Sequence, residues 1–211
     1  LEIGSNDGAF ISNFKNGKII CLEPCKNLAK ITKKKGYKTY SYYWNSKNVK
    51  KIKKKYGRID LIYSANTITH ISDLNDVFKS ISYLLSEKGI LIIEDPSLLD
   101  CLKQVSYDQF YNEHIYVFSA LAVKNILKKY NLELFDIKNI KTHGGSLRYF
   151  IKKEKNTSLK ISSSVKNQID KEINFGLNKY NTYRNFAIKS KISKKKLNIL
   201  LSNINKKNNI I

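Results

Sequence analysis

Short apolar runs alternate with helix-period segments through the first half of this 211-residue chain, and no other feature constrains the fold as strongly. The runs are of strand length, and the longer segments between them repeat apolar residues at helical spacing. Strands that are joined through helices lie parallel, with right-handed crossovers. The alternation therefore predicts an α/β fold built on a doubly wound sheet.

The same pattern gives the bounds of the expected elements. Strands are expected at residues 1–3, 19–23, 37–42, 60–64 and 89–94. Helices are expected at residues 9–15, 28–35, 47–56 and 74–85, with Asp73 as the N-cap of the last. Residues 98–110 are expected to be helical or irregular, and Ser119 is expected to cap a helix that ends near residue 130.

Two further strand-like runs follow at residues 132–140 and 147–152. They are joined through His143-Gly144-Gly145, where the glycines permit a tight turn. Two strands with so short a connection must be antiparallel. The sheet should therefore end in an antiparallel hairpin, unlike the fully parallel dinucleotide-binding fold.

A polar, lysine-rich helical segment is expected from residue 158 to residue 204, with a narrow apolar stripe formed by Ile161, Val165, Ile169 and Ile173. We divide the chain into a domain over residues 1–155 and a helical segment over residues 156–211. The chain opens within a strand, contains no methionine and closes on an apolar pair. We interpret it as an internal fragment of a longer protein.

Charge and cysteine content narrow the possible partners. The formal net charge is +22, but 36 of the 39 basic residues are lysine, because only Arg58, Arg148 and Arg184 are arginine. Nucleic-acid readers generally need arginine, so we interpret the lysines as a solvated surface that modestly attracts a diphosphate. The three cysteines form no C-x-x-C pair, and no apolar run approaches the length of a membrane span. We expect a cytoplasmic protein with no membrane segment and no metal site within this sequence.

A glycine-containing loop follows the first strand, where a doubly wound sheet binds a nucleotide-like cofactor. Gly4 and Gly8 are four residues apart, and Asn6 stands where a dinucleotide-binding loop has its middle glycine. Glu2 precedes the first glycine, which suits a cofactor that carries no phosphate. We therefore predict that Glu2, Gly4, Ser5, Asn6 and Gly8 contact such a cofactor.

Polar residues also follow the second and fourth strands, at the same edge of the sheet. Glu23 closes the second strand, where a carboxylate can accept hydrogen bonds from both hydroxyls of a ribose, and Pro24 follows it. Ser64 and Asn66 are expected to complete the cofactor site. His70 is expected to face the same cleft, although a lone histidine is more often a packed structural residue.

The segment Tyr111-Asn112-Glu113-His114 is the most specific constellation in the chain. Several titratable or hydrogen-bonding side chains so close together, just before a helix cap, are costly to bury without a function. A local hydrogen-bonded turn is the alternative interpretation.

Five strings together resemble one family: LEIGSNDGAF, CLEPCKNLAKI, SANTITHISDLND, FYNEHIYVFS and THGGSLR. They look like the S-adenosylmethionine-dependent C-methyltransferases that act on nucleotide-linked keto-deoxysugars, in order over about residues 1–153. The resemblance implies the class I methyltransferase form of the Rossmann-like fold, S-adenosyl-L-methionine as cofactor and a nucleotide-diphosphate sugar as substrate. It also implies a zinc-binding N-terminal domain and a further C-terminal domain outside this sequence.

By the same resemblance, Tyr111, Glu113, His114 and His70 match catalytic residues, with His114 as the base. A base is needed because a sugar offers a carbon nucleophile only as an enolate beside a ketone. His114 would take the α-proton, Glu113 would orient it or contact the sugar, and Tyr111 with His70 would donate hydrogen bonds to the enolate.

Two positions depart from the family pattern. Ser41 stands where many methyltransferases hold an acid near the adenine, which leaves adenine recognition open, and Asn112 replaces a frequent histidine. The alternatives are an O- or N-methyltransferase of another small molecule or RNA, and a truncated, inactive domain that still binds the cofactor. The sugar, the methylated carbon and the oligomeric state also stay open.

Overall fold

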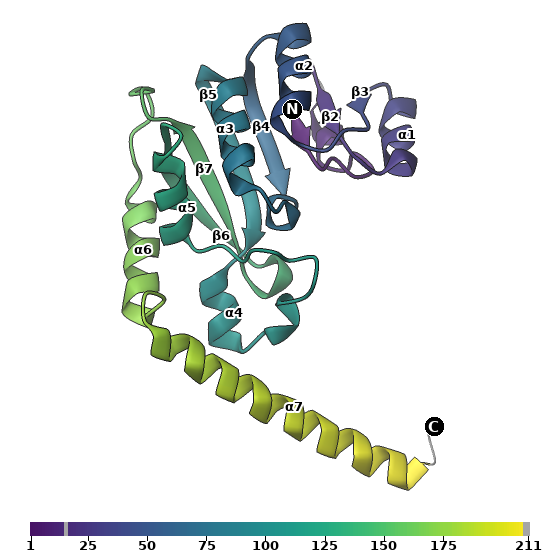
Figure 1. Ribbon diagram of the computed structural model, residues 1–211, viewed down its shortest axis with the longest axis vertical. Coiled ribbons are helices and arrows are strands. Elements are labelled where there is room, and N and C mark those ends of the chain that lie inside the picture. Colours follow the sequence, from purple (N-terminus) through teal and green to yellow (C-terminus); the bar gives the residue numbers. More distant parts are fainter. Residues whose placement is uncertain (15–16, 209–211) are drawn as a thin grey trace.

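A computed structural model describes residues 1–14 and 17–208, and the described chain forms one seven-stranded sheet flanked by helices (Figure 1). The strand order is β3-β2-β1-β4-β5-β7-β6. Neighbouring strands from β3 to β5 pair parallel, and β7 pairs antiparallel with both β5 and β6. The predicted doubly wound sheet with its terminal antiparallel hairpin is confirmed.

All seven predicted strands are present: β1 (Glu2–Ile3), β2 (Ile20–Leu22), β3 (Lys38–Tyr40), β4 (Ile59–Ala65), β5 (Leu85–Pro96), β6 (Leu132–Ile140) and β7 (Ser146–Lys153). Strand β5 begins earlier than predicted, because Leu85 is buried and pairs with Ile59 across a register shift.

The helices are α1 (Lys26–Lys34), α2 (Ser46–Tyr56), α3 (Leu74–Leu84), α4 (Leu98–Gln104), α5 (Ala120–Lys128), α6 (Ser163–Phe175) and α7 (Tyr180–Asn208), with 3₁₀ turns η1 (Ile11–Asn13), η2 (Ile68–His70), η3 (Tyr107–Gln109) and η4 (Thr142–Gly144). Both predicted N-caps are confirmed: Asp73 accepts from the Asp76 amide at 2.9 Å, and Ser119 accepts from the Ala122 amide at 3.2 Å.

The helix predicted at residues 9–15 is wrong over its described part, because only the 3₁₀ turn η1 forms there. Residue 15 lies outside the described residues. Two contacts compete with a helix. The ring of Phe10 stacks on Tyr63 at a centroid distance of 3.6 Å, and the side-chain amide of Asn13 donates to the carbonyls of Ala9 and Phe10.

The main core lies between one face of the sheet and the helices α3 and α5, which Figure 1 shows side by side over the strands. Leu91, Ile93 and Tyr149 contribute from the strands of this face, and each is at most 2% exposed. Helix α6 joins the same core through Val165 and Ile169. Because Ile161 and Ile173 of the predicted stripe are exposed, only half of that stripe packs.

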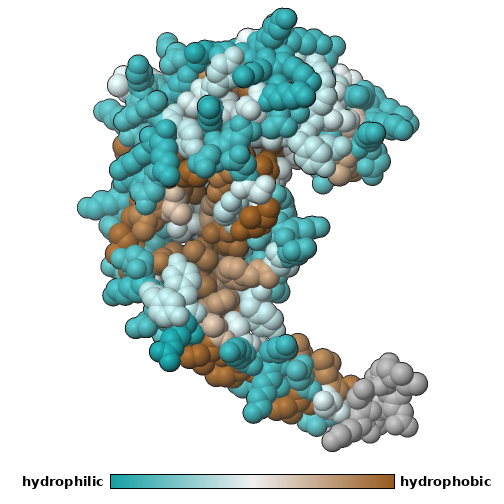
Figure 2. Space-filling view, viewed as in Figure 1, coloured by the Kyte–Doolittle hydropathy of each residue, from teal (hydrophilic) through white to brown (hydrophobic). Residues whose placement is uncertain are grey.

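Helix α7 projects away from the sheet (Figure 1). Hydrophilic and hydrophobic side chains are mixed along its surface (Figure 2), and its exposed apolar residues include Ile188, Ile192, Leu197, Ile199, Leu200 and Leu201. None of the helices in the described chain has the length and apolar character that a membrane crossing needs.

A buried carboxylate ties α6 to the start of α5. Glu172 is fully buried, and its two oxygens accept hydrogen bonds from the backbone amides of Ala120 at 2.8 Å and Leu121 at 2.9 Å. The side-chain amide of Gln168 donates to the same carboxylate at 3.1 Å. An anion at a helix N-terminus satisfies amides that have no partner within the helix.

Replacing Glu172 with Ala should lower the free energy of unfolding by about 2–4 kcal/mol, because two buried amides lose their acceptor. Urea denaturation measures the loss. Asp170→Ala, at an exposed position of the same helix, is the control and should change stability little. Equal urea midpoints for the two variants would contradict this role of Glu172.

Candidate functional site

A cavity of about 310 Å³ opens at the edge of the sheet where the parallel strands end. The loops that follow β1, β2, β3 and β4 surround it, and its lining is Ile3, Gly4, Leu22, Pro24, Tyr42, Tyr43, Trp44, Thr67, His70, Ile71 and Ser72. Of the residues predicted to form a site, Gly4, Pro24 and His70 lie on its wall. The fold thus gathers one cofactor-loop residue and one histidine around the same space.

Only glycine fits at position 4. Its φ is +70°, and an added Cβ would lie 2.3 Å from Oγ1 of Thr67. The amides of Gly4 and Ser5 both donate to the carbonyl of Leu22, at 2.8 and 3.2 Å. The loop after β1 is thereby fixed against β2 on one side and Thr67 on the other. Asn6 also has positive φ, at +49°, which asparagine tolerates better than most residues.

Glu23 is 5% exposed and lies beside this loop. One carboxylate oxygen accepts from the amide of Asn6 at 2.8 Å, and the other accepts from the amide of Cys25 at 2.9 Å. A carboxylate has about four acceptor sites, so each oxygen keeps a lone pair for a further donor such as a ribose hydroxyl. The two amide bonds orient the carboxylate before any ligand arrives.

Other predicted cofactor residues lie apart from the cavity wall. Ser64 is 1% exposed within the sheet, and Ser5 is also buried, with no partner for its hydroxyl among the described residues. Asn66 holds a left-handed conformation and donates its backbone amide to the carbonyl of Glu94. Gly8, at φ +84°, packs over Thr32.

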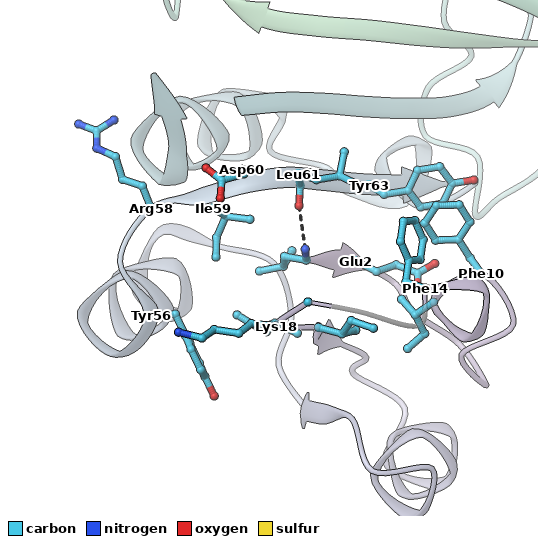
Figure 3. Close-up of a pocket in the computed structure, with 15 residues that line it drawn as sticks. Glu2, Phe10, Phe14, Lys18, Tyr56, Arg58, Ile59, Asp60, Leu61 and Tyr63 are labelled. Carbon is cyan, nitrogen blue, oxygen red and sulfur yellow. Dashed lines mark hydrogen bonds between the residues drawn. The ribbon is translucent and has the colours of Figure 1, made fainter. Parts of the chain in front are cut away.

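Glu2 lines a different cavity, of about 460 Å³. Its side chain extends toward the end of the cavity at which Phe10, Phe14 and Tyr63 lie (Figure 3). Burial raises the pKa of Glu2 to about 8, and one of its oxygens has no partner in the described chain. Glu2 lines this second cavity and is not among the residues that line the first, so its contact with the cofactor stays a prediction.

Three aromatic residues that the sequence reasoning did not assign form another wall of the 310 Å³ cavity. Tyr42, Tyr43 and Trp44 follow β3, the edge strand of the sheet. Trp44 is buried and donates its indole N–H to the carbonyl of Val77 at 3.4 Å, whereas Tyr43 is 74% exposed. The aromatic run directly after the third strand was the signal that could have identified this wall.

The structure brings three of the four predicted catalytic side chains together. His70 ends η2 and His114 lies between η3 and α5, yet their ring centroids are 5.0 Å apart. The hydroxyl of Tyr111 lies 2.9 Å from Nε2 of His114. The side chain of Glu113 is exposed, and this residue contributes its backbone carbonyl instead.

The carbonyl partners fix which nitrogen of each histidine carries the proton. Nδ1 of His70 lies 2.7 Å from the carbonyl of Glu113, and Nδ1 of His114 lies 2.8 Å from the carbonyl of Gln109. A carbonyl only accepts, so both Nδ1 atoms donate, and Nε2 of each neutral ring is an acceptor. Tyr111 therefore donates to His114, and His70 can donate from Nε2 only as an imidazolium.

Two further acids lie at the end of β5. Glu94 is paired with Arg148, whose Nη2 and Nε lie 2.7 and 2.9 Å from the same carboxylate oxygen. Asp95 is 1% exposed, neither of its oxygens has a partner among the described residues, and burial raises its pKa well above the ordinary range. In the part of the chain that the structure covers, no group of three or more His, Cys, Asp or Glu residues could hold a metal ion.

Comparison with known families covers almost the whole chain. Residues 1–137 match a family described as the methyltransferase domain, and residues 141–211 match the C-methyltransferase C-terminal domain. The chain belongs to the S-adenosylmethionine-dependent methyltransferases. The second match places it with the C-methyltransferases. Strand β7 lies in the second match and pairs with β5 in the first, so the two matches share one sheet.

This methyltransferase is 26% identical over 189 residues to C-methyltransferase NovU of Streptomyces niveus. The matched region covers 89% of this chain and 45% of NovU. The chain thus spans less than half the length of that curated relative.

Solved structures show the same fold. An S-adenosylmethionine-dependent methyltransferase from Clostridium acetobutylicum has a TM-score of 0.54 and 17% identity, covering 72% of this chain and 82% of that one. An O-methyltransferase from a trans-AT PKS multienzyme of Brevibacillus brevis, in complex with S-adenosyl-L-homocysteine, has a TM-score of 0.53 and 12% identity. The match covers 81% of this chain and 70% of that one. The predicted class I methyltransferase fold is confirmed.

Replacing Gly4 with Ala should destabilise the methyltransferase by more than the roughly 1–2 kcal/mol that a positive φ costs an L-residue. The excess comes from the clash with Thr67. Gly36→Ala is the matched control, because Gly36 has φ +90° and open space around its Cβ position. Urea denaturation of both variants gives the comparison, and equal losses would mean that Thr67 yields without cost.

Replacing Asp95 with Asn should stabilise the methyltransferase at neutral pH. The raised pKa of Asp95 means that the folded state keeps a proton which the unfolded state releases, so the contribution of Asp95 to stability falls as pH rises above about 4. Asn removes this dependence. Urea denaturation from pH 4 to pH 8 should show the two proteins diverging as pH rises, and parallel curves would contradict the assignment.

Proposed function

We propose that this methyltransferase binds S-adenosyl-L-methionine in the 310 Å³ cavity and methylates a carbon beside the ketone of a nucleotide-linked 4-keto-deoxysugar. The observation that carries the proposal is the pair His70 and His114, whose ring centroids lie 5.0 Å apart while His70 lines the cavity together with Gly4 of the cofactor loop. Such a pair suits removal of a proton from carbon near neutral pH. A cytoplasmic setting belongs to the same proposal.

The residues around the cavity fit this cofactor. The free lone pairs of Glu23 would accept the two ribose hydroxyls, and Gly4 lets the backbone approach closely. The aromatic wall formed by Tyr42, Tyr43 and Trp44 would face the adenine, which fits a chain that has Ser41 in place of an acid. Bound there, S-adenosylmethionine supplies an electrophilic methyl group.

His114 would hold the proton taken from the substrate. Its Nε2 accepts the α-proton, and the Nδ1–H bond to the carbonyl of Gln109 stabilises the imidazolium that results. The hydroxyl of Tyr111 must leave Nε2 for this to happen, which frees it to donate to the enolate oxygen that forms at the same time. Glu113, exposed beside the histidines, would contact the sugar.

Carbon is favoured over oxygen or nitrogen as the acceptor. Transfer to oxygen needs a base but no group to stabilise an enolate, whereas this site offers the hydroxyl of Tyr111 as a donor beside the base His114. The C-methyltransferase C-terminal match and the name of the NovU relative support the same choice. The net charge of +22 would attract a diphosphate-bearing sugar, although it would also attract RNA, which is the competing acceptor.

Replacing His114 with Asn should reduce methyl transfer by about 10²–10⁴-fold, which is the usual contribution of a positioned base. The affinity for S-adenosyl-L-homocysteine should be unchanged, because His114 does not line the cavity. Turnover with a 4-keto-deoxysugar nucleotide and calorimetry of cofactor binding measure the two effects.

The exposed His143→Asn is the matched control for loss of a histidine and should keep wild-type turnover. Near-normal turnover of His114→Asn would overturn the assignment of the base. Methylation of RNA rather than of the sugar nucleotide would overturn the proposed substrate class. A protein that binds S-adenosyl-L-homocysteine but transfers a methyl group to neither acceptor would be the truncated, inactive domain.

A further inference from the structure

We infer that Tyr116 and Thr69 are positioning residues, which fasten the loop of His70 to the loop of His114 and so fix the proton of His70 on Nδ1. We call the hydrogen bonds between residues 69–72 and residues 113–116 the loop clasp. Its effect on turnover rests on the proposed function, whereas its effect on the state of His70 does not.

Four hydrogen bonds make up the loop clasp. The backbone amide of Tyr116 donates to the carbonyl of Thr69 at 3.2 Å, and the hydroxyl of Thr69 donates to the carbonyl of Tyr116. The hydroxyl of Tyr116 donates to the carbonyl of Ser72 at 2.6 Å. Nδ1 of His70 donates to the carbonyl of Glu113 at 2.7 Å. Each bond joins residues that lie more than 40 positions apart in the sequence.

One side of the clasp is anchored in the core. Thr69 is 1% exposed and follows Ile68, which is fully buried. On the other side, the ring of Tyr116 stacks with Phe118 at a centroid distance of 6.1 Å, and Phe118 is buried and accepts from the amide of Leu98. The loop clasp therefore holds the loops of His70 and His114 against the rigid core.

The segment before Tyr116 has little else to hold it. Tyr111, Glu113 and Ile115 are exposed, and the backbone-to-backbone hydrogen bonds within residues 111–115 are local, from His114 to Tyr111 and from Ile115 to Glu113. In the described chain, the long-range contacts that hold this segment include the bond of the Glu113 carbonyl to His70 and the His114 ring beside that of His70, and the bonds of Tyr116 to Thr69 and Ser72 hold its end. Without them the carbonyl of Glu113 would leave Nδ1 of His70, and the proton of that ring would be free to move to Nε2.

The position of His70 gives the clasp a chemical consequence. His70 lines the cofactor cavity and His114 does not, so the separation of the two rings sets how the base faces the cavity. Misplacement of a reacting group by about 1 Å can cost on the order of 10²-fold in rate. The clasp would thus act on turnover, while the cofactor contacts at Gly4 and Glu23 stay as they are.

The test uses Tyr116→Phe, which removes one hydroxyl and keeps the ring. Tyr130→Phe is the matched control, because Tyr130 follows α5 and its hydroxyl donates to Asn75 of α3 at 2.7 Å, outside the loop clasp. The chain contains only three histidines, so ¹⁵N NMR of the imidazoles can resolve His70, His114 and His143. The wild type should show His70 protonated on Nδ1.

In Tyr116→Phe, the His70 signals should move toward a mixture of the two tautomers, and kcat should fall about 10-fold or more. The affinity for S-adenosyl-L-homocysteine should fall less than kcat does, because His70 and Ser72 line the cavity but Gly4 and Glu23 stay as they are. Tyr130→Phe should match the wild type in all three measurements. Wild-type His70 signals in a folded Tyr116→Phe protein would overturn the inference.

A second pair of variants tests the Thr69 hydroxyl. Thr69→Val removes it, whereas Thr69→Ser keeps it, so Ser should restore the His70 spectrum and turnover that Val loses. Equal behaviour of the two variants would also overturn the inference. The NMR spectra need no substrate. If the wild-type protein transferred no methyl group but Tyr116→Phe still changed the His70 signals, the proposed function would be rejected and the inference about the loop clasp would hold.

Discussion

The pairing of the two-residue strand β1 between β2 and β4 is the constraint on which the site depends. Glu2 lies opposite Cys21 on one side and Tyr63 on the other, and Ile3 lies between Leu22 and Ser64. Because these strands are parallel, their carboxyl ends finish at one level of the sheet. The glycine loop, the Glu23 carboxylate and the loop of Thr67 and His70 therefore converge without any direct link along the chain.

The two sides of this edge of the sheet are held in place by different contacts. On the side of the glycine loop, Gly4 against Thr67 and the two amide bonds to Glu23 leave little room for rearrangement. On the histidine side, backbone carbonyls hold His70 and His114, and the loop clasp joins their loops. A preorganised arrangement of this kind stabilises developing charge better than flexible groups do.

Much of the fold was predictable because strand and helix periods differ and because the cap residues are local signals. Asp73 and Ser119 cap the helices expected of them, and the Gly144-Gly145 turn sets the hairpin. The helix at residues 9–15 was not predictable, since the stacking of Phe10 on Tyr63 joins residues far apart in the sequence. The sequence also did not show toward which face of the sheet Glu2 and Ser64 point. Strands β1 and β4 lie inside the sheet, so their sequences do not alternate apolar and polar residues in a way that distinguishes the two faces. The division of the chain at residue 155 stays a prediction.

The sequence alone determined which chemical groups stand after the strands and in the loops: the glycine loop, Glu23, His70, and the segment with Tyr111 and His114. It could do so because strand ends and loop residues follow from local periodicity and turn chemistry. Only the tertiary structure decided where the protons lie, since His70 takes its tautomer from the carbonyl of Glu113, which is 43 positions away along the chain. It also decided that Tyr42, Tyr43 and Trp44 line the 310 Å³ cavity, and that Glu2 lines a second cavity. These outcomes depend on contacts between distant segments, which no local pattern in the sequence records.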